Sequence, residues 1–208
     1  MATRIDDLTV TGTLKCSDTA ISPQTRDSIL TQDPLAVFPI PWTDLRVWDA
    51  FQTNLPGTAA TDDLALIGGT FGTAPPMVQA GDLKAAGATT RYARFQVVVP
   101  ECYDAAETLS LVLSAGMKTT VADASCTVDV EAYRADKISG ISADLCATAA
   151  QSINSLVFAS KTFVITAASL AAGDILDVRI AIACNDAATG TAVTPTIAGL
   201  DLVCDIKG

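Results

Sequence analysis

The side chains of this sequence that could do chemistry are almost all carboxylates. The chain has 23 Asp and Glu residues and no histidine, so it lacks the commonest general base and metal ligand. It also contains no GxSxG elbow, HExxH or Walker A motif. A glycosidase-like pair of carboxylates is therefore the one catalytic arrangement that the composition still permits.

Two pairs of acidic residues are close enough in sequence to be considered for such a role. They are Asp129 with Glu131, and Asp174 with Asp177. Both pairs fall on the outward faces of expected strands or in turns, where carboxylates usually keep a sheet face soluble and its edges unpaired. We therefore expect a protein that is not an enzyme and that uses no cofactor.

A metal site is not expected either. Asp62, Asp63 and Asp186 lie in expected loops and could in principle bind calcium, but the DxDxDG spacing of a calcium loop is absent. The glycines at 68, 69 and 72 could in principle cradle a phosphate, but TAPP follows them in place of a lysine and a helix. A bulge or a kinked strand is the structural interpretation of these glycines.

The six cysteines need not form a disulfide scaffold in a chain with this many apolar residues. Cys126, Cys184 and Cys204 have the inward parity of their expected strands, where a thiol behaves as a small hydrophobic group. We expect reduced core thiols, with one or two bridges as the alternative. No CxxC pair is present, so a zinc site is not expected.

The elements that must position these residues are strands, because apolar and polar residues alternate one for one through the second half of the chain. Asp177 with Arg179, and Asp129 with Glu131, occupy the parity opposite to the apolar residues, so each strand has one core face and one solvent face. The pattern predicts an all-β, jelly-roll β-sandwich of about eight to ten antiparallel strands. The apolar members of the pattern are Phe95, Val97, Val99, Leu109, Leu111, Leu113, Cys126, Val128, Val130, Leu176, Val178, Ile180, Ile182, Leu200, Leu202 and Ile206.

Some pairings and strands can also be proposed from local order. TDLRVWDAF is expected to form the first strand of the sandwich, and TLSLVLSAGM and SCTVDVEAYR are expected to be neighbours in one sheet. The segment 191–196 is uncharged and rich in Ala and Thr, which a monomer has little reason to keep so apolar.

The chain is expected to divide near residue 43, into an N-terminal arm (1–43) and the sandwich (44–208). The arm has one short alternating piece, and three prolines in DPLAVFPIPW then hold the backbone extended. A flexible tail is one interpretation; an arm that lies on another protein is favoured, because this segment is too apolar for a solvated linker. The candidate contacts of the arm with another protein or subunit are Leu8, Val10, Leu14, Leu35, Val37, Phe38, Ile40 and Trp42.

Charge and hydropathy limit the partners. A net charge of −10 and a pI near 4.2 argue against nucleic acid or an anionic membrane as partner, because phosphate binding needs clustered Lys and Arg. No stretch approaches the roughly 18–20 apolar residues of a membrane span. Acidic residues near the N-terminus argue against a secretory signal peptide.

The run from TDLRVWDAFQTNLPG through RYARFQVVVPECY, followed by ITAASLAAGDILDVRIAIACND and a closing LDLVCDIKG, resembles tailed-bacteriophage capsid decoration, or cement, proteins with a jelly-roll body. The N-terminal DLTVTGTL is similar to the short β arm at the start of such phage structural chains. The resemblance implies a protein made in the host cytoplasm and placed on the capsid surface of the virion. It also implies a homotrimer on threefold axes that bridges neighbouring copies of the major capsid protein and stabilises the head.

Two other classes remain open at this stage. A receptor-binding or fibre-tip jelly roll would recognise host surface glycans, and Tyr103, Tyr133 and Trp48 are the aromatic residues considered for it; packing on the sheet edge is their alternative role. A jelly-roll enzyme acting on carbohydrate is the third possibility, and the absence of histidine and of a convincing carboxylate pair argues against it.

Overall fold

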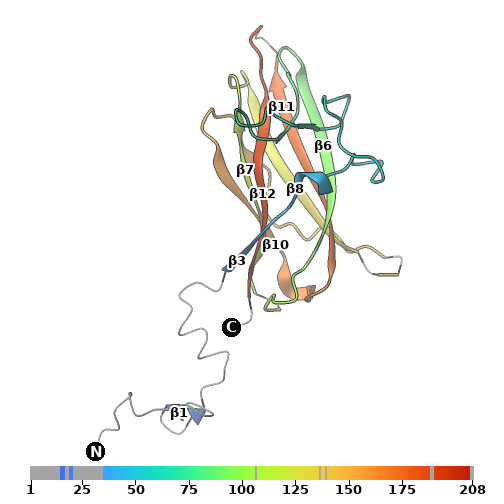
Figure 1. Cartoon of the computed structure of the whole chain (residues 1–208), viewed down its shortest axis with the longest axis vertical. Helices are drawn as coiled ribbons and strands as arrows, with labels where there is room; N and C mark the ends of the chain where they lie inside the picture. Colours follow the sequence, from blue (N-terminus) through green and yellow to red (C-terminus); the bar gives the residue numbers. More distant parts are fainter. Residues whose placement is uncertain are drawn as a thin grey trace, which may run out of the picture.

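The computed structural model describes residues 15–16, 19–20 and 35–206, apart from residues 106, 136, 139 and 188–189. Between residues 35 and 206 the chain is a β-sandwich of two antiparallel sheets (Figure 1). The two short helical turns of the described part are 3-10 turns, η2 (Trp42–Asp44) and η3 (Ala167–Ser169). No helix among the described residues has the length and apolar character needed to span a membrane.

One sheet has six strands and the other has four, so the described part of the sandwich has ten strands, as predicted. The six-stranded sheet runs in the order β10 (Ala159–Ile165), β7 (Leu109–Met117), β12 (Pro195–Asp205), β5 (Met77–Gln79) and β4 (Ala65–Ile67), and β3 (Leu35–Pro39) also pairs with β12. The four-stranded sheet runs β6 (Gly87–Val98), β11 (Ile175–Asp186), β8 (Ser125–Ala135) and β9 (Gln151–Ser152). A separate pair, β1 (Lys15–Cys16) and β2 (Thr19–Ala20), precedes the sandwich.

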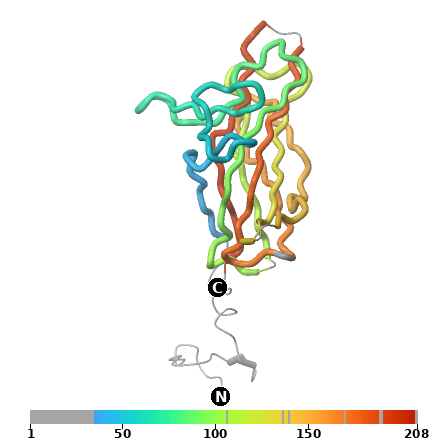
Figure 2. The backbone as a smooth tube through the Cα atoms, turned by 90° about the vertical axis from the view of Figure 1, so that its right-hand side faces the viewer, coloured from blue at the N-terminus to red at the C-terminus, as the bar shows by residue number. Residues whose placement is uncertain are grey.

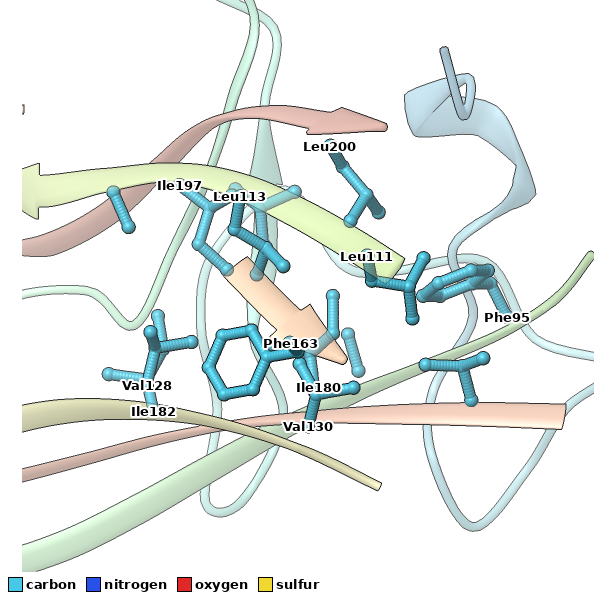
Figure 3. Packing of buried hydrophobic residues seen from close by; sticks show 14 of the residues in the cluster. Phe95, Leu111, Leu113, Val128, Val130, Phe163, Ile180, Ile182, Ile197 and Leu200 are labelled. Atoms are coloured by element: carbon cyan, nitrogen blue, oxygen red, sulfur yellow. The ribbon is translucent and has the colours of Figure 1, made fainter. Parts of the chain in front are cut away.

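The core lies between the two sheets and contains the residues whose parity marked them as inward (Figure 3). Val128, Val130, Ile180 and Ile182 of the four-stranded sheet face Leu111, Leu113, Ile197 and Leu200 of the six-stranded sheet, with Phe163 and Phe95 filling the space between them. Each of these side chains has 3% or less of its surface exposed. The alternating pattern is confirmed because a strand can place every second side chain in a core of this thickness.

The predicted pairing of TLSLVLSAGM with SCTVDVEAYR is wrong. These segments are β7 and β8, and they lie in different sheets: β7 pairs with β10 and β12, whereas β8 pairs with β11 and β9. The connection between them crosses the sandwich and is held by the Met117 N–H, which donates to Ser155 O, and by the Lys118 N–H, which donates to Thr194 O. Alternation defines which face of a strand is inward but not which strand lies beside it.

The expected first strand, TDLRVWDAF, does not form a ladder. Leu45 and Val47 are buried, as the alternation predicts, but Arg46 makes only isolated bridges, to Asn54 and Arg94. The chain turns back almost at once, since the Val47 N–H donates to Thr53 O at 3.0 Å.

The N-terminal boundary lies earlier than residue 43. β3 runs antiparallel along the C-terminal half of β12, from Pro39 opposite Asp201 to Leu35 opposite Asp205. Ile40 is 8% exposed, and Phe38 and Trp42 pack against the core, so these three residues belong to the sandwich itself. This corrects their assignment as external contacts: proline kept the segment extended, but its own sheet supplies the partner strand. Leu8, Val10 and Leu14 lie outside the described residues.

Cys102, Cys126, Cys146, Cys184 and Cys204 are free thiols, and Cys126, Cys184 and Cys204 are buried as predicted. Cys126 lies directly opposite Cys184 in the register of β8 and β11.

Candidate functional site

The outer face of the four-stranded sheet carries most of the polar and aromatic side chains that could recognise a ligand. Because β6, β11 and β8 pair in one continuous register, their outward residues form rows across the sheet. Along β11 the outward residues change from charged to small, since Asp177 and Arg179 are followed by Ala181 and Ala183. The rows are Gln96–Asp177–Tyr133, Arg94–Arg179–Glu131, Tyr92–Ala181–Asp129 and Thr90–Ala183–Thr127.

Two ion pairs organise the charged end of this face. Arg94 donates to Asp177 at two points, from Nε to Oδ1 at 2.7 Å and from Nη2 to Oδ2. The hydrogen bond that Arg94 donates to Asp177 raises the pKa of the Arg94 guanidinium, although burial opposes this shift. Arg179 Nη2 lies 2.5 Å from Glu131 Oε2. Both arginines are therefore neutralised locally and held in fixed orientations.

Aromatic rings from different parts of the chain border the face. Trp48 lies against Tyr92, with ring centroids 5.1 Å apart at an interplanar angle of 48°. The Arg179 guanidinium carbon lies 4.9 Å from the Tyr92 centroid and 5.5 Å from that of Trp48, which gives cation–π contact with both. Trp48 is also fixed by its indole N–H, which donates to Asp62 Oδ2 at 3.1 Å. Burial, followed by the charges of Glu131 and Asp144, raises the pKa of Tyr133.

Two adjoining hollows follow this face and share Glu131 and Arg179 in their walls. The first has a volume of about 330 Å³ and is lined by Trp48, Asp49, Arg94, Glu131, Tyr133, Ile141, Asp177 and Arg179. The second has a volume of about 250 Å³ and is lined by Thr90, Tyr92, Thr127, Asp129, Glu131, Ala150, Arg179, Ala181 and Ala183. We call the two together the sheet groove.

The predicted carboxylate pairs take different positions. Asp129 and Glu131 both line the sheet groove from β8. Asp177 lies in the same groove, but Asp174 lies in the turn before β11, where its Oδ2 accepts the Ala171 N–H at 2.9 Å. Asp177 and Glu131 are each paired with an arginine. The arrangement is suited to holding polar groups in place.

The aspartates considered for calcium binding lie in two separate places. Asp186 is fully buried and accepts the N–H groups of Ala85 and Asp123, each at 3.0 Å. Asp63 lies near Asp62 and Asp49, and burial followed by these two charges raises the pKa of its carboxyl. Within the described ranges, no three His, Cys, Asp or Glu side chains converge as metal ligands would.

The aromatic residues considered for glycan recognition lie in different environments. Trp48 and Tyr133 both line the sheet groove, whereas Tyr103 is buried and its hydroxyl donates to Glu107 O at 2.9 Å. Tyr92 and Arg94 were missed as site residues. The available signal was their outward parity in RYARF, but only the register with β11 shows that they stand beside Arg179 and Ala181.

The outer face of the six-stranded sheet is different in character. Val37 of β3, Val203 of β12, Ser110 of β7 and Val164 of β10 form one row across four strands, with no charge in it. Val37 is 61% exposed and Val164 is 46% exposed. We call this the valine row.

β3 also leaves part of its backbone facing outward. The Ile40 N–H donates to Leu200 O at 2.9 Å, and antiparallel hydrogen bonds alternate along a strand. The backbone groups of Val37 therefore point away from β12, and no partner for them occurs among the described residues.

The glycines at 68, 69 and 72 lie in the β4–β5 connection, which projects sideways from the sandwich (Figure 2, teal). Gly69 has a φ of 68°, and a Cβ there would lie 2.2 Å from Ala74 O, so the tight turn requires glycine. The connection exposes Phe71 completely. The expected bulge or kinked strand is wrong: these glycines lie in a turn between β4 and β5, outside both strands.

Similarity to known proteins is found among solved structures. No family model and no curated protein sequence matches the chain. Among solved structures, the chain is similar to the xylan-binding module CBM15, with 14% identity, a TM-score of 0.44, and coverage of 83% of this chain and 99% of that one. It is similar to a Family 16 Carbohydrate Binding Module-2, with 11% identity, a TM-score of 0.39, and coverage of 72% and 89%. A chain of the infectious bursal disease virus Gx strain structure has 12% identity and a TM-score of 0.39, with coverage of 83% of this chain and 34% of that one.

Proposed function

We propose that this chain is a non-catalytic structural protein of a phage virion, which binds the outside of the capsid and bridges neighbouring major capsid subunits, as a homotrimer. The observation that carries the proposal is the valine row beside the outward backbone of β3. An uncharged strip whose exposed side chains are valines, next to an open strand edge, is suited to contact with another protein, through buried apolar area and through strand addition.

The position of β3 makes this edge the natural attachment point. Val37 presents both its side chain, 61% exposed, and its outward backbone groups. The strip continues through Val203 to Val164 on the far edge strand β10. A partner could therefore pair with β3 and cover the row in one contact, which would stabilise a loaded capsid by mass action.

The segment 191–196 does not support the trimer as first expected. Val193, Thr194 and Thr196 are buried within the chain, since this segment leads into β12 and is covered by the sandwich. The proposal that the subunits associate therefore depends on the resemblance to decoration proteins and on the exposed side chains of Val37 and Val164 in the valine row.

Cryo-electron microscopy of intact particles tests the proposal directly. We expect density for the sandwich on the head, repeated at threefold or quasi-threefold positions. Density only at the tail tip, or none on the particle, would contradict a decoration role.

A variant locates the contact. We expect Val37→Lys to reduce occupancy on capsids by about tenfold or more, because a charge would have to be buried at the contact. Val98→Lys is the matched control, since Val98 is 55% exposed on β6 of the other sheet. Circular dichroism confirms that both variants fold. Equal occupancy of the two variants would remove the valine row as the contact.

A further inference from the structure

We infer that the sheet groove is a binding site for neutral oligosaccharides, on the sheet opposite to the valine row. This is a second activity, separate from attachment to the capsid, and each can fail without the other.

The floor and walls of the groove have the chemistry that a sugar chain needs. Ala181 and Ala183 form a flat floor of small side chains on β11. Tyr92 stands on one side, opposite Asp129 on the other, in a single register row. An aromatic ring can cover the apolar face of a sugar, while a carboxylate accepts hydrogen bonds from its hydroxyl groups.

The groove is organised before any ligand arrives. Arg179 is held by Glu131 and by the rings of Tyr92 and Trp48, and Arg94 is held by Asp177. Fixed donors and acceptors lower the cost of ordering side chains on binding. The hydroxyls of Thr90 and Thr127, which also line the groove, add groups that both donate and accept.

The shape favours a chain of sugars over a single small molecule. The two hollows adjoin along β11 from Asp177 to Ala183, a distance of about 20 Å at a rise of about 3.3 Å per residue. Their volumes of about 330 and 250 Å³ are near the lower end of the roughly 300–1,000 Å³ that is typical of ligand pockets.

The charge of the groove selects against acidic glycans. The two arginines are neutralised by Asp177 and Glu131. Asp129 accepts only the Val130 N–H, at 3.0 Å, and it has no cationic partner in the part of the chain that the structure describes. Asp49, which is exposed, adds a further negative charge at the edge of the groove. Uronate or sialate groups would therefore be repelled.

The test begins with the full chain on a printed array that carries neutral oligosaccharides of hexoses and pentoses beside uronate- and sialate-bearing ones. We expect binding to a subset of the neutral glycans and none to the acidic ones. A protein that binds nothing on the array, or that prefers the acidic glycans, would overturn the inference.

Titration calorimetry with the best neutral oligosaccharide then locates the site. We expect Tyr92→Ala to weaken binding by about tenfold, because it removes the ring contact, and Asp129→Asn to weaken it several-fold. Phe71→Ala is the matched aromatic control, since Phe71 is fully exposed in the β4–β5 connection, outside the groove lining, and its affinity should be unchanged.

A further variant tests the site without removing the ring of Tyr92 or the carboxylate of Asp129. Ala181→Leu keeps every polar group but fills the floor of the groove, and it should abolish binding. Undiminished affinity in Ala181→Leu would show that the glycan binds elsewhere and would overturn the inference.

Discussion

Arg94 on β6 lies directly opposite Arg179 on β11, and two carboxylates keep the two guanidinium groups from repelling each other. Arg94 turns diagonally to Asp177, at 2.7 Å from Nε to Oδ1, and Arg179 turns to Glu131, at 2.5 Å. Like charges directly opposite on neighbouring strands destabilise a sheet. The two ion pairs therefore offset the repulsion that would otherwise oppose placing both arginines in the groove.

The first prediction concerns this arrangement. Arg94→Met should lower the free energy of unfolding by about 1–3 kcal/mol, because Asp177 would lose its ion-pair partner. The loss is limited because the Arg94 side chain is a third exposed to solvent. Asp177 is only 7% exposed. Urea denaturation at pH 7 measures the change. Lys84→Met is the control, since its pair with Asp82 is exposed and should contribute almost nothing; an equal loss in both variants would contradict the prediction.

The second prediction concerns Asp186, which ties two loops to the end of β11. Its two carboxylate oxygens accept the N–H groups of Ala85 and Asp123, and Ala85 has a positive φ of 54°. Asp186→Ala should cost about 2–4 kcal/mol, because two hydrogen bonds to a fully buried carboxylate are lost. Thermal and urea unfolding measure the loss. The exposed Asp44→Ala provides the comparison, and a loss below about 0.5 kcal/mol in Asp186→Ala would be incompatible with this role.

The third prediction is a pH dependence with a definite sign. Burial, followed by the charges of Asp62 and Asp49, raises the pKa of Asp63 above 3.8, so the folded state holds this proton more tightly than the unfolded chain. Stability from this group is complete below pH 3.8 and is lost as the pH rises through the raised pKa. Asp63→Asn removes that loss.

The Asp63→Asn variant should therefore melt roughly 1–3 °C higher than the parent at pH 7. Its advantage should disappear in scans at pH 3. An unchanged melting temperature at pH 7, or a lower one, would show that the charge of Asp63 is compensated in the folded protein.

The fourth prediction concerns the thiols. Burial raises the pKa of Cys204 to about 11, and the contact with Cys184 together with burial raises the pKa of Cys126. Since the thiolate is the reactive form, iodoacetamide at pH 8 should modify the exposed Cys102 well before these two. Peptide mass spectrometry follows each cysteine, and labelling in urea should equalise them. Comparable rates in the native protein would contradict the buried positions.

The candidate site could be predicted from the sequence only in part. Asp129, Glu131, Asp177 and Arg179 could be assigned to a solvent face, because a strand sends alternate side chains to opposite sides. Their contact with Tyr92 and Trp48 could not be predicted, because it depends on which strand lies beside β11 and on a loop that returns over β6. The N-terminal boundary was misplaced for a related reason, since nothing local in LAVFP shows that β12 is its partner.

The sequence by itself determined the class of fold and the identity of the core. Alternation of apolar and polar residues is a local property of each strand, and it correctly assigned Leu111, Val128 and Ile180 to the interior. Only the tertiary structure decided that β7 and β8 belong to different sheets, that β3 completes the six-stranded sheet, and that the sheet groove exists. Strand pairing and register are contacts between residues far apart in the chain, so they depend on the packing of the whole sandwich and not on any single segment.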